Sequence, residues 1–133
     1  MIAPRGVAEV QRAFQRQGLA AIGYDIIFGS ADDICSPEGF LRAVRLATML
    51  QPQGVTHWAT KCSRWVWVSR SQTQRHKSDV FAETNPNNHL SNMMLVRSVL
   101  IIMLIVALQG EFVVEQPATS LMFKVADMNV KED

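Results

Sequence analysis

Apolar runs alternate with polar segments along the first third of the chain, and their spacing predicts a helix followed by a strand. Apolar residues recur at helical spacing from Val7 to Phe14, and Gly18 is well placed to end that helix. The run from Ala20 to Phe28 is apolar apart from Asp25 and predicts a buried strand.

A strong helix start follows at Ser36-Pro37-Glu38, which combines an N-cap residue, a proline at the first helical position and an early acid. The inner face of this helix is expected to consist of Phe40, Leu41, Val44 and Ala47. After the stop signals Pro52 and Gly54, residues Val55 to Ala59 predict the next strand.

The second half begins with a long polar segment, Ser69 to Asn88, for which we expect a mobile loop over about residues 69–90. Met93 to Leu108 is almost wholly apolar but shorter than the roughly 20 residues that a bilayer requires, so it predicts a buried helix. Phe112 to Glu115 predicts a further strand, which Pro117 ends.

This order of helices and strands predicts an α/β fold with a mostly parallel sheet and helices on its faces. The length of 133 residues fits a single domain, here expected over residues 1–123, with 124–133 as a tail without a clear element. Two cysteines are too few for a disulfide framework, and no signal peptide is visible, so we expect an intracellular protein.

The net charge of +1 conceals an uneven distribution. No acidic residue lies between Gly39 and Ser78, whereas seven basic residues do. Such a stretch indicates either an anion-facing surface, for example toward phosphate, or a solvated loop with incidental charge.

Two residues that could take part in catalysis lie at or just after the ends of predicted strands. Cys62 follows the strand at Val55–Ala59, and Lys61 and Arg64 beside it would lower the pKa of its thiol from about 8.5. Glu115 closes the last strand, where a carboxylate is costly unless it has partners or reaches solvent. Because chemistry gathers at the carboxyl ends of parallel strands, these two residues are the candidate catalytic pair, although a packed cysteine and a solvated glutamate are the plain alternatives.

The remaining residues give weaker indications of a binding site. Asp25 lies inside a predicted strand, and acids near the end of the second strand bind ribose hydroxyls in nucleotide-binding α/β folds. The three histidines and two cysteines show no metal-ligand spacing, so no metal site is expected. No glycine-rich phosphate loop is present.

Taken in order, four short motifs between Val7 and Met122 resemble the core of a DNA (cytosine-5)-methyltransferase. Tyr24-Asp25-Ile26 resembles the segment whose acid contacts the ribose of S-adenosylmethionine, and Asp33-Ile34 resembles the pair that contacts its adenine. Thr60-Lys61-Cys62-Ser63 resembles the Pro-Cys motif, and Val114-Glu115-Gln116-Pro117 resembles the Glu-Asn motif.

The resemblance implies that the Cys62 thiolate adds to C6 of a cytosine while Glu115 hydrogen-bonds ring nitrogen N3. It implies S-adenosylmethionine as cofactor and DNA as partner, with the target base turned out of the helix stack. The expected phosphate contacts are Arg64, Arg70, Arg75 and Lys77.

The chain departs from the family pattern. The first strand and its Phe-x-Gly-x-Gly turn are missing or reduced to Ile2–Gly6, Lys61 replaces a proline, and Gln116 replaces an asparagine. The later Gln-x-Arg-x-Arg motif and the target recognition region are absent. We therefore expect a partial Rossmann-like sheet with its first strand missing or reduced, and a fragment or degenerate copy without activity alone.

Two further readings stay open. One is a non-catalytic α/β module that binds nucleic acid or protein, and the other is a small membrane-associated protein anchored through Met93–Leu108. Because a central strand would be lacking, we also expect self-association through an exposed sheet edge.

Overall fold

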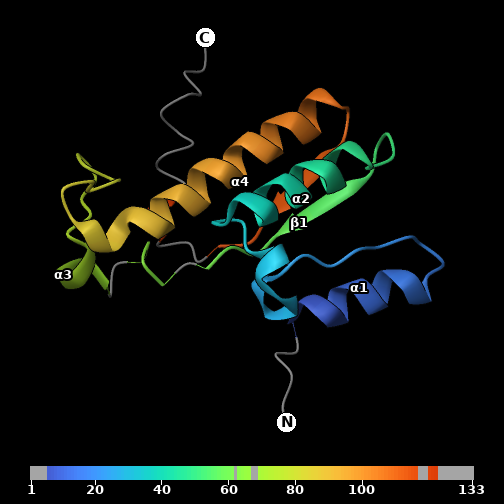
Figure 1. The fold of residues 1–133 in the computed structure, drawn as a ribbon, viewed down its shortest axis with the longest axis horizontal. Coiled ribbons are helices and arrows are strands. Elements are labelled where there is room, and N and C mark those ends of the chain that lie inside the picture. The colour runs from blue at the N-terminus through green and yellow to red at the C-terminus, as the bar shows by residue number, and fades with distance from the viewer. Residues whose placement is uncertain (1–5, 62, 67–68, 117–119, 123–133) are drawn as a thin grey trace. The chain divides into compact units, whose positions relative to one another are not determined.

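The computed structural model describes residues 6–61, 63–66, 69–116 and 120–122. These residues form four α-helices and two strands, separated by short 3-10 turns (Figure 1). The chain divides into two compact units, Met1–Arg45 and Leu46–Asp133. In chain order the helices and strands are α1 (Gly6–Arg16), α2 (Pro37–Thr48), β1 (Val55–Trp58), α3 (Arg70–Thr73), α4 (His89–Ala107) and β2 (Glu111–Val114).

The first unit begins with the predicted helix. Gly18 follows α1 with φ of 76°, a backbone conformation that favours glycine, so its predicted place at the helix end is confirmed. The strand predicted from Ala20 to Phe28 is wrong, since this segment has no regular structure before a 3-10 turn at Ile26–Phe28. Its backbone finds no partner strand among the described residues, and the Asp25 carboxylate instead accepts the N–H of Ile27 at 2.9 Å.

α2 starts where the sequence predicts, because Ser36 Oγ accepts the N–H of Gly39 at 2.9 Å. Of the predicted inner face, Ala47 is buried and Phe40 and Val44 are half-buried, but Leu41 is 67% exposed. Gly39 and Ala43, which were not predicted, are buried as well. A Cβ at Gly39 would lie 1.9 Å from the carbonyl oxygen of Asp33, so only glycine permits this close approach. Leu41 lies about 200° further round the helix and therefore faces solvent.

The second unit is built on one pair of parallel strands. β1 pairs with β2 in the register Val55↔Glu111 to Trp58↔Val114. This confirms both predicted strands and the parallel arrangement, but the described residues form a two-stranded sheet rather than a full Rossmann-like one. Parallel neighbours require a long crossover connection, and α4 lies in it.

α4 contacts β2 and buries one stripe of its surface. Its buried residues are Ser91, Leu95, Ser98, Ile101 and Ile105. The prediction of a buried helix is wrong for the opposite face, where Leu100 and Met103 are 52% and 63% exposed. A two-stranded sheet offers too little surface to cover a helix that is apolar all round. By length and composition alone, Pro86–Ala107 is a candidate membrane span, and 28% of its apolar 18-residue window is buried.

The core of the second unit includes residues from the segment that was predicted to be a loop. Trp65, Val80, Leu95 and Met122 form a buried cluster, and the Trp65 and Phe81 rings meet edge to face with centroids 6.4 Å apart. The polar segment Ser69–Asn88 is therefore not irregular throughout, since it contains α3 and a 3-10 turn and supplies core residues. Its mobility stays a prediction.

Candidate functional site

The carboxyl ends of β1 and β2 meet at one edge. The Glu115 N–H continues the strand pairing by donating to the carbonyl of Trp58 at 2.8 Å. Just beyond it, Gln116 Nε2 donates to Thr60 O at 2.7 Å and to Thr60 Oγ1 at 3.0 Å. The segments that follow the two strands are thus fastened together, as the parallel arrangement predicts. The candidate nucleophile, Cys62, lies outside the described residues.

Glu115 is the member of the predicted catalytic pair that the structure describes. Its side chain is 72% exposed, and its Oε2 lies 3.3 Å from His57 Nε2. It therefore reaches solvent, which is the alternative that the sequence left open, and it is not a buried carboxylate in an apolar setting. His57, which precedes the end of β1, is a partner that the sequence analysis missed. An exposed carboxylate oriented by an imidazole can hydrogen-bond a ligand at this edge.

Gln116 holds the two segments at this edge together by hydrogen bonds. In the sequence it stood out only as a departure from the family pattern. Besides its two bonds to Thr60, its Oε1 accepts the hydroxyl of Ser120 at 3.3 Å. The Thr60 hydroxyl in turn lies 3.6 Å from the sulfur of Met122. A carboxamide has both a donor and an acceptor, so one side chain can hold two segments at once.

The turn that follows Cys62 is held by a buried arginine. Arg75 is 1% exposed and Trp65 is fully buried. The guanidinium carbon lies 3.6 Å from the centroid of the Trp65 ring system, a cation–π contact. The guanidinium also donates to four acceptors: the carbonyls of Arg64, Val80 and Phe81 at 2.9, 2.7 and 3.0 Å, and Ser91 Oγ at 2.8 Å.

These contacts give Arg75 a structural role in place of the predicted contact with phosphate. Burial and the nearby charge of Arg64 lower the pKa of the guanidinium to about 10, so it stays charged at neutral pH. Because its donors are used inside the chain, the prediction that Arg75 contacts phosphate is wrong. Arg64 and Arg70 are half-buried, and Lys77 is exposed. Contact of these three with nucleic acid stays a prediction.

Buried carboxamides complete the network around Arg75. Asn88 is fully buried, and its Nδ2 donates to the carbonyls of Thr73 and Ala82 at 2.7 and 3.1 Å. Buried Asn85 and half-buried Asn92 donate in the same way to Gln72 O and Phe81 O, at 2.8 and 2.9 Å. The amides satisfy carbonyls of a non-regular backbone, which is how a polar segment can fill an interior. The run of asparagines before the apolar helix is the signal that could have indicated this.

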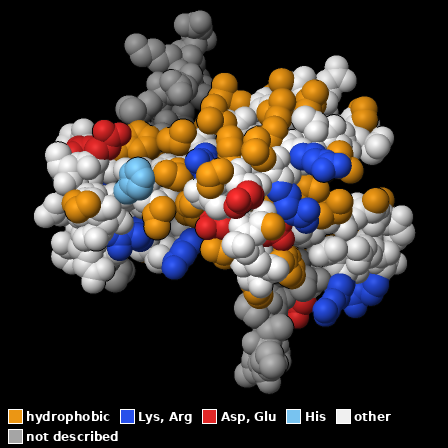
Figure 2. Space-filling model, in the orientation of Figure 1, with side chains coloured by type: hydrophobic (Ala, Val, Ile, Leu, Met, Phe, Trp, Pro, Cys, Tyr) orange, Lys and Arg blue, Asp and Glu red, His pale blue; other side chains and the backbone are white. Residues whose placement is uncertain are grey.

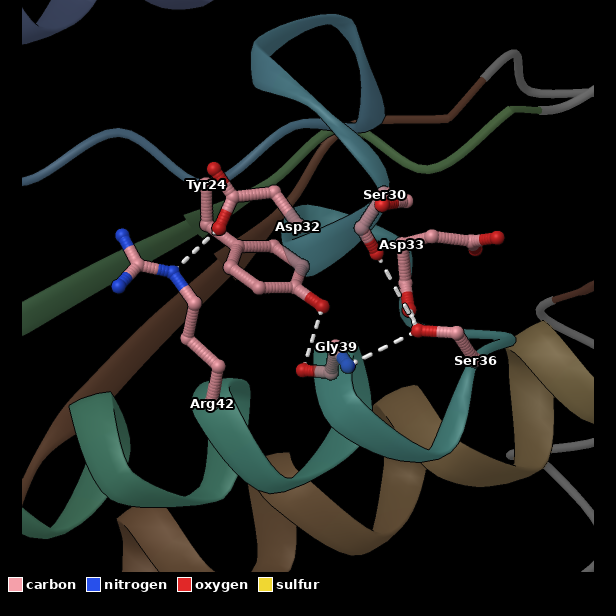
Figure 3. Close-up of polar contacts among 7 residues, drawn as sticks. All are labelled: Tyr24, Ser30, Asp32, Asp33, Ser36, Gly39 and Arg42. Atoms are coloured by element: carbon pink, nitrogen blue, oxygen red, sulfur yellow. Dashed lines mark hydrogen bonds and ion pairs between the residues drawn. The ribbon is translucent and has the colours of Figure 1, made fainter.

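In the first unit, polar contacts join the α2 start to the turns before it (Figure 3). The Tyr24 hydroxyl donates to the carbonyl of Gly39 at 2.7 Å, and buried Asp32 forms an ion pair with Arg42. Burial, followed by the negative charges of Asp32 and Asp33, raises the pKa of Tyr24 to about 12. Asp32 and Arg42 were not among the candidate residues of the sequence analysis.

The four predicted cofactor-binding residues lie around these turns. Asp25 is half-buried and Ile26 is 62% exposed, while Asp33 and Ile34 are both half-buried. Asp25 and Asp33 each accept a backbone N–H of their own turn, from Ile27 and Cys35, at 2.9 Å. An acid and apolar side chains suited to a ribose and an adenine are therefore present. The sequence holds no glycine-rich turn to cradle the rest of S-adenosylmethionine, so the fit is partial.

No set of three His, Cys, Asp or Glu side chains in the described part of the chain could hold a metal ion. Comparison with models of protein families, with curated proteins and with solved structures finds no match. The site is thus characterised by its own geometry.

The Arg75 network yields a stability prediction. Arg75→Ala should lower the free energy of unfolding by about 2–4 kcal/mol, since it removes the donor to the buried carbonyl of Val80 and to Ser91 Oγ and the cation that packs on Trp65. Urea unfolding followed by tryptophan fluorescence measures this. Lys77→Ala, in the same segment but exposed, is the control and should change stability by less than about 0.5 kcal/mol. Equal effects of the two substitutions would contradict the assigned role of Arg75.

Tyr24 yields a titration prediction, because it is the only tyrosine in the chain. Its phenolate absorbance should appear with a midpoint near the pKa of about 12 rather than the ordinary 10. Since the folded-state pKa is raised, the associated stability is fully present below pH 10 and is lost as the pH rises toward 12. Asp32→Asn should lower the midpoint. A midpoint near 10 in protein that circular dichroism shows to be folded would refute the assigned environment.

Proposed function

We propose that this chain is a DNA (cytosine-5)-methyltransferase-like α/β module whose chemical groups lie at the β1–β2 edge. The observation that carries the proposal is the fastening of Gln116 to Thr60, which holds the ends of both strands together. Glu115 directly precedes Gln116, and Cys62 comes two positions after Thr60. The two motifs that resemble the nucleophile and the base-holding carboxylate therefore adjoin one edge of the parallel pair.

The chemistry of this edge is nucleophilic addition to a pyrimidine. The Cys62 thiolate forms a bond to C6 of cytosine, and the electron pair of the C5–C6 double bond moves to make C5 nucleophilic. In its carboxylic acid form, Glu115 donates a hydrogen bond to N3 and favours that addition. Its exposed carboxylate, next to His57, is suited to meet a base that enters from solvent. Once C5 had taken up a methyl group, loss of the C5 proton would re-form the C5–C6 double bond, break the S–C6 bond and regenerate the thiolate.

S-adenosylmethionine would supply the methyl group that C5 takes up. Asp25 would bind the ribose hydroxyls, Asp33 would contact the adenine, and Ile26 and Ile34 would supply apolar contact. Because the sequence lacks the Phe-x-Gly-x-Gly turn, we expect weak cofactor binding and no methylation by this chain alone. Arg64, Arg70 and Lys77 are the proposed phosphate contacts.

A non-catalytic module that binds protein or nucleic acid is the second candidate. The exposed apolar face of α4 favours it, since contiguous apolar surface on a protein usually marks an interaction site. Calorimetry with S-adenosylmethionine separates the candidates: heat that is lost in Asp25→Ala supports the first, and its absence supports the second.

The nucleophile is tested by covalent trapping. A DNA oligonucleotide with pyrimidin-2-one at a mispaired position accepts a thiolate at C6 without needing methyl transfer. The intact chain and Cys35→Ser should form an adduct that survives denaturation, whereas Cys62→Ser should form none. Glu115→Gln should lower the rate of adduct formation about 10²-fold.

Cys35→Ser is the matched control, since it removes the other thiol of the chain. Mass spectrometry of the peptide that contains the adduct identifies the attacked residue. The proposal fails if folded protein forms no adduct, or if the adduct forms equally at both cysteines.

A further inference from the structure

α4 is apolar on its exposed side as well as on its buried side. Ser91 and Ser98 are 8% and 3% exposed and belong to the buried stripe of the helix. Between Val96 and Val106, five large apolar residues are exposed: Val96 at 47%, Val99 at 40%, Leu100 at 52%, Met103 at 63% and Val106 at 52%. We call these five residues the α4 seam. A helix on a protein surface normally presents its polar side to water, so the seam calls for a partner.

Hydrophobic side chains gather along the course of α4 in the space-filling view (Figure 2). Successive seam positions are three or four residues apart, apart from the adjacent pair Val99 and Leu100, so they form one stripe along the helix. Such a stripe is the surface that packs against another helix. It contains no charged residue, and Arg97, the one charged residue within α4, is half-buried.

We propose that the α4 seam packs against the same seam of a second copy of this chain. An uncharged stripe is self-complementary, because a two-fold axis brings it against itself without opposing like charges. About half of the surface of five apolar side chains amounts to on the order of 400 Å², the size of the largest apolar patch on a typical monomer, and such a patch is often functional. It is roughly half of what each partner in a standard interface buries, so the dimer is weak and concentration-dependent.

A lipid bilayer suits the seam less well. Arg97 and Ser98 lie near the middle of the candidate membrane span Pro86–Ala107, where polar groups oppose insertion. Helices that lie on membranes carry several basic residues along their polar face, and α4 has one. The seam is also distinct from the sheet edge expected from the sequence, since it lies on a helix. The proposal does not depend on the methyltransferase-like function.

Sedimentation velocity of the full chain under reducing conditions, from about 1 to about 100 μM, tests the proposal. The intact protein should change from monomer to dimer over this range. Met103→Lys should weaken association at least tenfold. Leu41→Lys should leave it unchanged, because it places the same charge on an apolar residue of α2 that is 67% exposed.

A second variant locates the contact. Met103→Cys, in a chain with Cys35→Ser and Cys62→Ser, should be joined to a second copy by a short bis-maleimide, whereas Leu41→Cys in the same background should not. A monomer at every concentration overturns the proposal, as does a dimer that Met103→Lys does not weaken. Flotation of monomeric protein with phosphatidylcholine or phosphatidylserine vesicles, without dimer formation, would assign the seam to lipid instead.

Discussion

The parallel pairing of β1 with β2 is the interaction on which the rest of this structure depends. Parallel strands place their carboxyl ends at the same edge, and here Gln116 fastens that edge by bonding Thr60. The same pairing requires the long crossover that contains α4, and the crossover contains the segment held by Arg75. The joined strand ends, the buried polar network and the apolar seam all lie on segments that this one pairing brings together.

The elements that carry local signals were predictable. The cap at Ser36, the glycine after α1 and the two short β-prone runs are found where the sequence predicts them. The predictions failed where the structure of a segment depends on another segment that pairs with it or packs against it. Ala20–Phe28 has the composition of a strand but has no neighbouring strand among the described residues, and Asp25 caps a turn instead. Leu41 was placed inside because apolar spacing does not show that Gly39 must lie against the Asp33 backbone.

The candidate site was predictable in its position more than in its content. The meeting of the strand ends follows from the α/β pattern, but the contacts of Gln116 and His57 depend on register, which the sequence did not specify. Arg75 was taken for a surface cation because its neighbours are polar. In fact Ser91 and the Trp65 ring contact its guanidinium directly, and buried Asn88 holds the neighbouring backbone in place. These contacts offset the desolvation cost of burying the charge.

The register of the two strands is measured most directly by NMR couplings across hydrogen bonds. The structure predicts couplings from the Glu111 nitrogen to the Gly54 carbonyl carbon and from the Glu115 nitrogen to the Trp58 carbonyl carbon, because these N–H groups donate at 2.9 and 2.8 Å. Both couplings together fix a parallel pair in this register. Cross-strand contacts between α-protons, typical of antiparallel strands, or rapid exchange of both amides with solvent would contradict the shared edge and the function proposed for it.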